Sequence, residues 1–120
     1  MDAQDKAKIE RIIKDRKAAH GLHISRDSKV YKAFLDMERA AYSSGTLEKK
    51  IKEFIAVGIS IVIDCESCIE WHIHEALLAG ASEAQILEAI DVAIEMGGGP
   101  ATVSSRFALK VLEYYSKGEH

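Results

Sequence analysis

The stretch EFIAVGISIVIDCESCIEWH, residues 53–72, indicates that the chain folds as helices. The segment from Phe54 to Ile63 is apolar at almost every position. Its β-branched residues permit a strand, but its length and surroundings favour a helix over about residues 47–64. Because a helix that is apolar all round is buried on every side, we expect it to contact a second subunit as well as its own chain.

Apolar residues recur three and four positions apart on either side of this stretch, which is the period of a helix. Ser82 and Gln85 form the capping-box pattern S-x-x-Q at the start of one helix, and the run from Gly97 to Pro100 should end it. The sequence therefore predicts a compact all-α bundle of about six helices in a single domain, residues 1–120. These helices are expected over roughly residues 4–19, 28–42, 47–64, 65–80, 82–96 and 102–115.

The charge of the chain argues against nucleic acid as a partner. It carries 16 Lys and Arg against 19 Asp and Glu, and the two signs are interspersed with no basic block that could follow phosphates. The charged N-terminus lacks the apolar core of a secretory signal, and no apolar run is long enough to cross a bilayer. We therefore expect a cytoplasmic protein with no membrane partner.

Cys65, Cys68 and His72 form a C-x-x-C-x-x-x-H pattern that is typical of thiol chemistry. At this spacing the three side chains share one stripe of a helix. A helix N-terminus, a second cysteine and an imidazole all favour the reactive thiolate. Because His72 is one turn from Cys68 and two turns from Cys65, we predict that Cys68 attacks the substrate and that Cys65 resolves the product as a disulfide.

Two other interpretations of this element stay open. The cysteines and the histidine could simply pack in a helical core, since free cysteine is among the most buried residues. Alternatively, Cys65, Cys68 and His72 could bind zinc with Glu53 or His74, although structural zinc sites usually draw ligand pairs from two separate segments. The redox interpretation requires neither a metal nor another cofactor, and we expect none.

Glu53 lies twelve residues before Cys65, and the motif E-x(11)-C-x-x-C-x-x-x-H resembles that of the alkylhydroperoxidase D-like family, also called the carboxymuconolactone decarboxylase family. A looser similarity extends from about Phe34 to the C-terminus. The resemblance implies compact all-α subunits that assemble into trimers or hexamers. It also implies that Glu53 orients and polarises His72, that His72 deprotonates Cys68, and that Cys65 closes the disulfide.

The resemblance further implies a thiol-dependent peroxidase or disulfide reductase that acts on a hydroperoxide or a disulfide. Its electrons would come from a thiol reductant, either a dithiol protein or a lipoyl-type donor. Ser67 stands where some peroxidase members carry a histidine, a departure that bears on peroxidase efficiency. The alternative is a lyase that opens a lactone-derived acid through Glu53 and His72 without redox cysteines. A non-catalytic oligomeric binding module is the third hypothesis.

Overall fold

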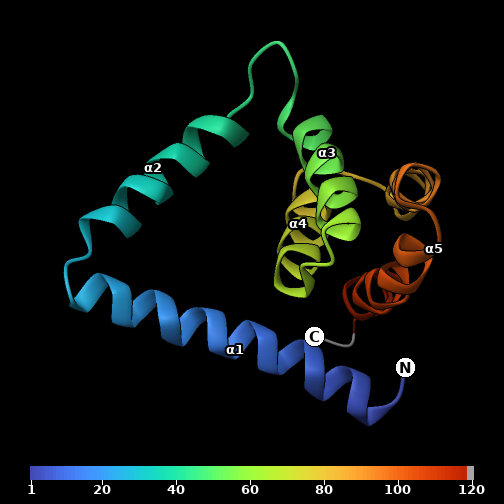
Figure 1. The fold of residues 1–120 in the computed structure, drawn as a ribbon, viewed down its shortest axis with the longest axis horizontal. Helices are drawn as coiled ribbons and strands as arrows, with labels where there is room; N and C mark the ends of the chain where they lie inside the picture. The colour runs from blue at the N-terminus through green and yellow to red at the C-terminus, as the bar shows by residue number, and fades with distance from the viewer. Residues whose placement is uncertain (119–120) are drawn as a thin grey trace.

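The computed structural model describes residues 1–118 as helices joined by short connections (Figure 1). The helices are α1 (Ala3–Ser25), α2 (Lys29–Tyr42), α3 (Lys49–Val62), α4 (Glu66–Leu78) and α5 (Glu83–Ser116). No strand occurs among these described residues, so the predicted all-α class is confirmed. The expected number of helices was too high, because residues 82–96 and 102–115 both belong to α5.

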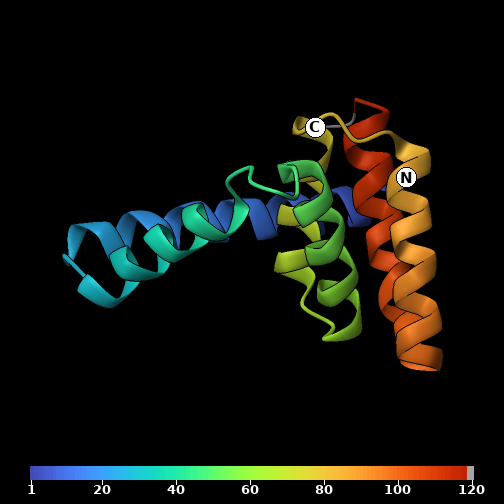
Figure 2. The same ribbon diagram turned by 90° about the horizontal axis from the view of Figure 1, so that it is seen from above.

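The predicted break after residue 96 is a kink inside α5. Gly98 has the non-helical angles φ 67° and ψ −149°, a conformation that favours glycine, and Pro100 follows inside the helix. The two halves of α5 run back alongside each other from this point (Figure 2). Gly97 is also constrained, because a Cβ atom there would lie 2.6 Å from the Ala101 side chain. The position of the break was predicted correctly, but one glycine is enough to turn the chain.

The signals around the turn between α4 and α5 are confirmed. The Ser82 hydroxyl accepts a hydrogen bond from the Gln85 backbone N–H, and the Gln85 side-chain oxygen accepts one from the Ser82 N–H, both at 3.1 Å. Gly80, after the end of α4, has a φ of 96°, which is the left-handed conformation expected of a residue that terminates a helix. Local side-chain chemistry therefore sets this turn.

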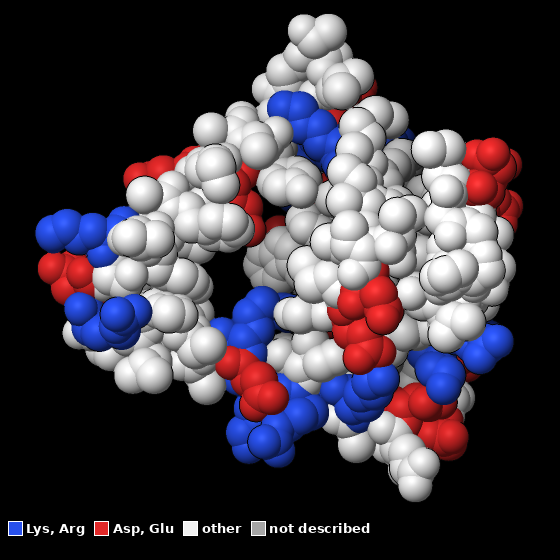
Figure 3. All heavy atoms as spheres, viewed as in Figure 1, with Lys and Arg blue, Asp and Glu red and all other residues white. Residues whose placement is uncertain are grey.

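The core lies between α3, α4 and α5, and α1 contributes one buried residue, Ile9. The fully buried side chains of the three central helices include Val57, Ile61, Ile69, Ile73, Ile86 and Val111. The helix α2 has no buried residue, and together with the C-terminal half of α1 it forms an arm that extends away from this core (Figure 2). The surface is hollowed between the arm and the other helices, and acidic and basic side chains are interspersed over it (Figure 3).

The outer face of α3 is exposed rather than buried within its own chain. Ile55, Ile59 and Val62 of α3 and Val92 and Met96 of α5 are each about half exposed or more. They line an apolar groove of about 540 Å³ between the two helices. A single chain therefore leaves open the face of α3 that we expect a second subunit to cover, and this contact stays a prediction.

Across residues 1–118, no helix combines the length and the apolar character that crossing a bilayer requires.

Candidate active site

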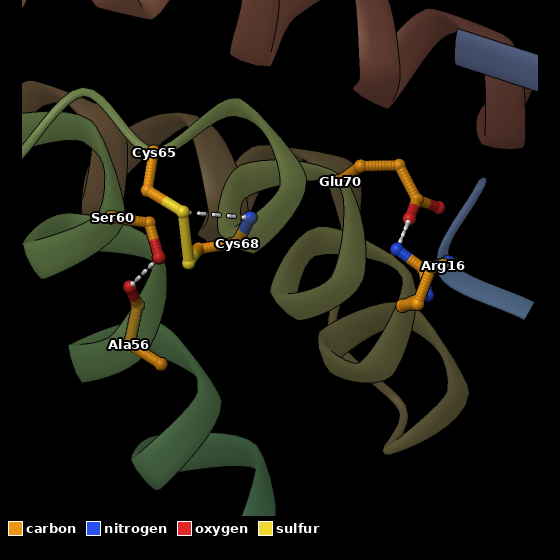
Figure 4. Close-up of a disulfide and its surroundings, with 6 residues drawn as sticks. All are labelled: Arg16, Ala56, Ser60, Cys65, Cys68 and Glu70. Atoms are coloured by element: carbon orange, nitrogen blue, oxygen red, sulfur yellow. Dashed lines mark hydrogen bonds and ion pairs between the residues drawn. A yellow bond between two sulfur atoms is a disulfide. The ribbon is translucent and has the colours of Figure 1, made fainter. Parts of the chain in front are cut away.

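Cys65 and Cys68 are joined by a disulfide at the start of α4 (Figure 4). Their Cα atoms are 5.2 Å apart, which lies within the ordinary range for bridged cysteines. Cys65 is the N-cap residue, with an extended backbone, and its Sγ accepts a hydrogen bond from the Cys68 N–H at 3.3 Å. The predicted helical stripe is therefore shorter than expected, since only Cys68 and His72 lie within the helix. The pair is nevertheless at bonding distance.

The turn between α3 and α4 places Cys65 at this helix end. The Cys65 N–H donates to the Ser60 carbonyl at 3.0 Å, and Asp64 takes a left-handed conformation with φ 56°. The Asp64 carboxylate accepts a hydrogen bond from the Ser104 hydroxyl at 2.9 Å, which ties the turn to α5. Ser60 is buried, and its hydroxyl donates back to the Ala56 carbonyl (Figure 4). The first cysteine is thus held by the end of one helix and caps the next.

His72 and Glu53 form a hydrogen-bonded pair between α4 and α3. The His72 Nδ1 atom lies 2.7 Å from Oε1 of Glu53, and Glu53 is only 1% exposed. Because an ionised carboxylate only accepts hydrogen bonds, Nδ1 carries the proton and Nε2 of a neutral imidazole keeps its lone pair. His72 follows Cys68 by one helical turn, so this geometry offers a proton acceptor on the helix that begins with the cysteines.

Lys49 binds the other oxygen of the buried carboxylate. Its Nζ atom lies 3.2 Å from Oε2 of Glu53 and 3.8 Å from Oε1 of Glu75 on α4. A buried charge is tolerated in proteins when it is paired and hydrogen-bonded. Both oxygens of Glu53 therefore have partners, one on its own helix and one on α4.

Tyr42, the last residue of α2, packs beside the imidazole. Its ring centroid lies 5.2 Å from that of His72, with the planes tilted by 34°. Burial is the main cause that raises the pKa of Tyr42, and the charges of Glu53 and Glu38 raise it further, so its hydroxyl stays protonated at neutral pH. A pocket of about 210 Å³ opens here, with walls that include Tyr42, Lys49, Glu53, Trp71 and Glu75.

Sequence reasoning missed both Lys49 and Tyr42. The four-residue spacing between Lys49 and Glu53 was available as a signal, since such residues are neighbours on a helix. No signal marks Tyr42, because it reaches His72 only through the way α2 meets the core.

The opposite face of α4 carries a second group of polar residues. Glu70 is fully buried and pairs with Arg16 of α1 (Figure 4) and with the hydroxyl of Tyr115 of α5. His74 stacks on Tyr115 with ring centroids 4.1 Å apart. Trp71 packs under Arg16, whose guanidinium carbon lies 4.9 Å from the centroid of the indole ring.

The zinc interpretation finds no support in the arrangement of donors. Among residues 1–118, no group of three or more His, Cys, Asp or Glu side chains could hold a metal ion. Zinc binds cysteine as a thiolate, whereas here the two sulfurs are bonded to each other.

Fold and site together define an all-helical protein with a C-x-x-C disulfide beside a histidine–glutamate pair. The model of the carboxymuconolactone decarboxylase family matches residues 28–111. The chain belongs to this family, which includes the alkylhydroperoxidase D-like proteins.

Relatives and solved structures agree with this assignment. The chain is 42% identical over 81 residues to "Uncharacterized protein 4 in cox locus" of Paracoccus denitrificans, covering 68% of this chain and 73% of that protein. It is similar in structure to a carboxymuconolactone decarboxylase family protein of Legionella pneumophila, with a TM-score of 0.80, 29% identity and coverage of 92% and 96% of the two chains. A family member of Thermotoga maritima, for which a part in antioxidative response has been suggested, gives a TM-score of 0.82 at 30% identity, covering 91% and 92%.

Proposed function

We propose that the protein is a thiol-dependent peroxidase or disulfide reductase that cycles Cys65 and Cys68 between dithiol and disulfide. The observation that carries this proposal is the disulfide at the start of α4, the helix that also carries His72, which is hydrogen-bonded to Glu53 of α3. A helix N-terminus and a neighbouring imidazole both favour a thiolate. The antioxidative role suggested for the Thermotoga maritima relative supports the same function.

The first half of the cycle oxidises Cys68. In the reduced protein, Nε2 of His72 takes the thiol proton, and the Cys68 sulfur attacks the terminal oxygen of a hydroperoxide. The S–O bond forms as the O–O bond breaks, and the leaving alkoxide receives the proton from His72 and departs as an alcohol. Cys68 becomes a sulfenic acid, and the hydroperoxide is reduced by two electrons.

The second half restores the dithiol. The Cys65 sulfur attacks Cys68, the S–S bond replaces the S–OH bond, and water leaves with the thiol proton. A dithiol protein or lipoyl-type donor then supplies two electrons by thiol–disulfide exchange and ends as a disulfide itself. With a disulfide substrate the first attack gives a mixed disulfide, which Cys65 resolves. Such donors are abundant in the cytoplasm, where we place the protein.

The test is a count of free thiols before and after brief treatment with limiting hydroperoxide. We expect two thiols to disappear for each hydroperoxide consumed and to return on addition of a dithiol. Cys68→Ser should abolish consumption, whereas Cys65→Ser should keep the first turnover and leave Cys68 open to over-oxidation. Unchanged hydroperoxide and disulfide turnover in Cys68→Ser would rule out this mechanism.

A lyase is the second candidate, because the Glu53–His72 pair is intact while both cysteines are oxidised. Such an enzyme would act on a lactone-derived acid through these two side chains alone. Alkylation of the reduced cysteines separates the two functions: turnover of a lactone substrate would survive it, whereas peroxide or disulfide reduction would stop.

We also propose that the chain forms a homo-oligomer, a trimer or hexamer, through the apolar groove between α3 and α5. Exposed apolar residues are common singly, but a contiguous apolar groove of this kind is typical of an interface. A second copy would also bury the outer face of α3 that its own chain leaves open.

A further inference from the structure

We propose that Lys49 is a positioning residue of the proton relay, which keeps the Glu53 carboxylate ionised and aligned with His72. This inference rests on the proposed function and deepens it. The Lys49 ammonium lies 3.2 Å from one Glu53 oxygen, while His72 Nδ1 lies 2.7 Å from the other. The carboxylate is therefore held from both sides, and its rotation is restricted to the orientation that receives the Nδ1–H group.

Burial makes this second partner necessary. Glu53 is 1% exposed, and a neutral imidazole supplies no charge to balance a buried carboxylate. Without Lys49, binding of a proton by the carboxylate or by His72 becomes more favourable. In the first case the imidazole loses the negative charge that polarises it, and in the second Nε2 loses its lone pair. Either change weakens the base that the cycle requires at neutral pH.

The place of Lys49 in its helix gives an independent argument. It is the first residue of α3, where the helix dipole disfavours a cation, and the first turn contains no acidic residue. A lysine four residues before a glutamate is also the weaker order for a stabilising pair on a helix. Helix stability therefore does not explain this lysine, and such local conflicts are expected at functional sites.

Lys49 also connects the two helices that carry the relay. Its Nζ atom lies 3.8 Å from Glu75, which is one turn beyond His72 on α4. The same ammonium thus bridges the helix that carries Glu53 and the helix that carries His72, and it opposes any sliding of one past the other.

The experiment compares Lys49→Met with Lys49→Arg, and uses Lys52→Met as a matched control. Lys52 lies on the same helix, but its Nζ donates to the Ser43 carbonyl at 2.7 Å. The first readout is the titration of the His72 ring by NMR, and the second is the pH dependence of thiol oxidation by hydroperoxide. The other charged or titratable groups around the pair, unchanged in these variants, are Glu38, Arg39, Tyr42 and Glu75.

We expect Lys49→Met to move both midpoints to higher pH by about one unit, because without the Lys49 cation the Glu53 carboxylate favours the charged imidazolium more strongly, and a charge at this range shifts a titration by one to three units. Lys49→Arg should restore the wild-type profile, and Lys52→Met should leave it unchanged. A His72 titration in Lys49→Met that matches the wild type would overturn the inference. If Lys49→Met does not fold, Lys49→Gln provides the same comparison. The NMR readout needs no turnover, so it tests the role of Lys49 even if the proposed activity fails. If the wild-type protein does not cycle its thiols, the proposed activity is overturned and the inference about Lys49 is not.

Discussion

The sulfur of Cys65 accepts a hydrogen bond from the backbone N–H of Cys68, so the first cysteine of the pair caps the helix that carries the second. Helix N-caps are usually Ser, Thr, Asp or Asn, whose oxygens are better acceptors than sulfur. A cysteine here is therefore a compromise between helix stability and chemistry. The same position places the sulfur where the positive end of the helix dipole favours a thiolate.

Substitution of Cys65 should separate its capping role from its redox role. In the reduced protein, Cys65→Ser keeps a side-chain acceptor, and we expect its free energy of unfolding to equal or exceed that of the wild type. Cys65→Ala removes the cap and should lose up to about 1 kcal/mol. Urea unfolding in excess reductant measures both. Equal stability of the two variants would contradict the capping role.

Glu53→Gln should slow the oxidation of Cys68 while leaving the fold intact. The amide keeps the shape of the side chain but loses the charge that favours proton transfer to His72. We expect the rate of thiol oxidation by hydroperoxide, measured by stopped flow, to fall at least about tenfold, since general base catalysis contributes roughly 10² to 10⁴. Glu88→Gln, at an exposed position of α5, is the control and should not differ from the wild type. An unchanged rate in Glu53→Gln would exclude Glu53 from the relay.

The buried pair of Tyr115 and Glu70 should make stability fall in alkaline solution. Burial is the largest cause that raises the pKa of Tyr115, followed by its hydrogen bond to the Glu70 carboxylate. A tyrosine of the unfolded chain ionises near about pH 10. The stability that Tyr115 contributes is therefore fully present below that pH. It is lost as the pH rises further, because only the unfolded state then releases the proton.

Tyr115→Phe should reduce this alkaline slope. Urea unfolding of the wild type and the variant at several values between about pH 9 and pH 11 measures it. Tyr42→Phe is a useful comparison, since the pKa of Tyr42 is also raised but its hydroxyl does not contact Glu70. If Tyr115→Phe keeps the full slope, the loss of stability belongs to other groups.

The sequence was most informative where the signal is local. The capping box at Ser82 and the break near Gly98 were predicted because each depends on a few neighbouring residues. The bonding reach of Cys65 and Cys68 follows from their spacing, which is also local. Their catalytic roles remain predictions, since bonding distance does not establish turnover.

Contacts between distant segments could not be predicted in the same way. Arg16 and Glu70 are far apart in the sequence, and nothing in either segment shows that α1 crosses α4 at this point. The same holds for Tyr42 and His72, which meet only because α2 ends beside the core. The sequence predicted two helices where the structure has the single kinked helix α5. The reason is that periodicity cannot tell a loop of several residues from a single non-helical glycine.

The apolar groove should be a contact between copies of the chain, and Ile59→Glu tests this. Ile59 is 55% exposed in the single chain, so a charge there should leave the subunit fold and its free energy of unfolding nearly unchanged. In an assembly the same charge would be buried without a partner, and the oligomer should dissociate. Light scattering with size-exclusion chromatography measures the mass. Val103→Glu is the control, because Val103 is 54% exposed but lies outside the groove, and it should keep the wild-type mass. Should Ile59→Glu keep the wild-type mass as well, the contact between copies lies elsewhere.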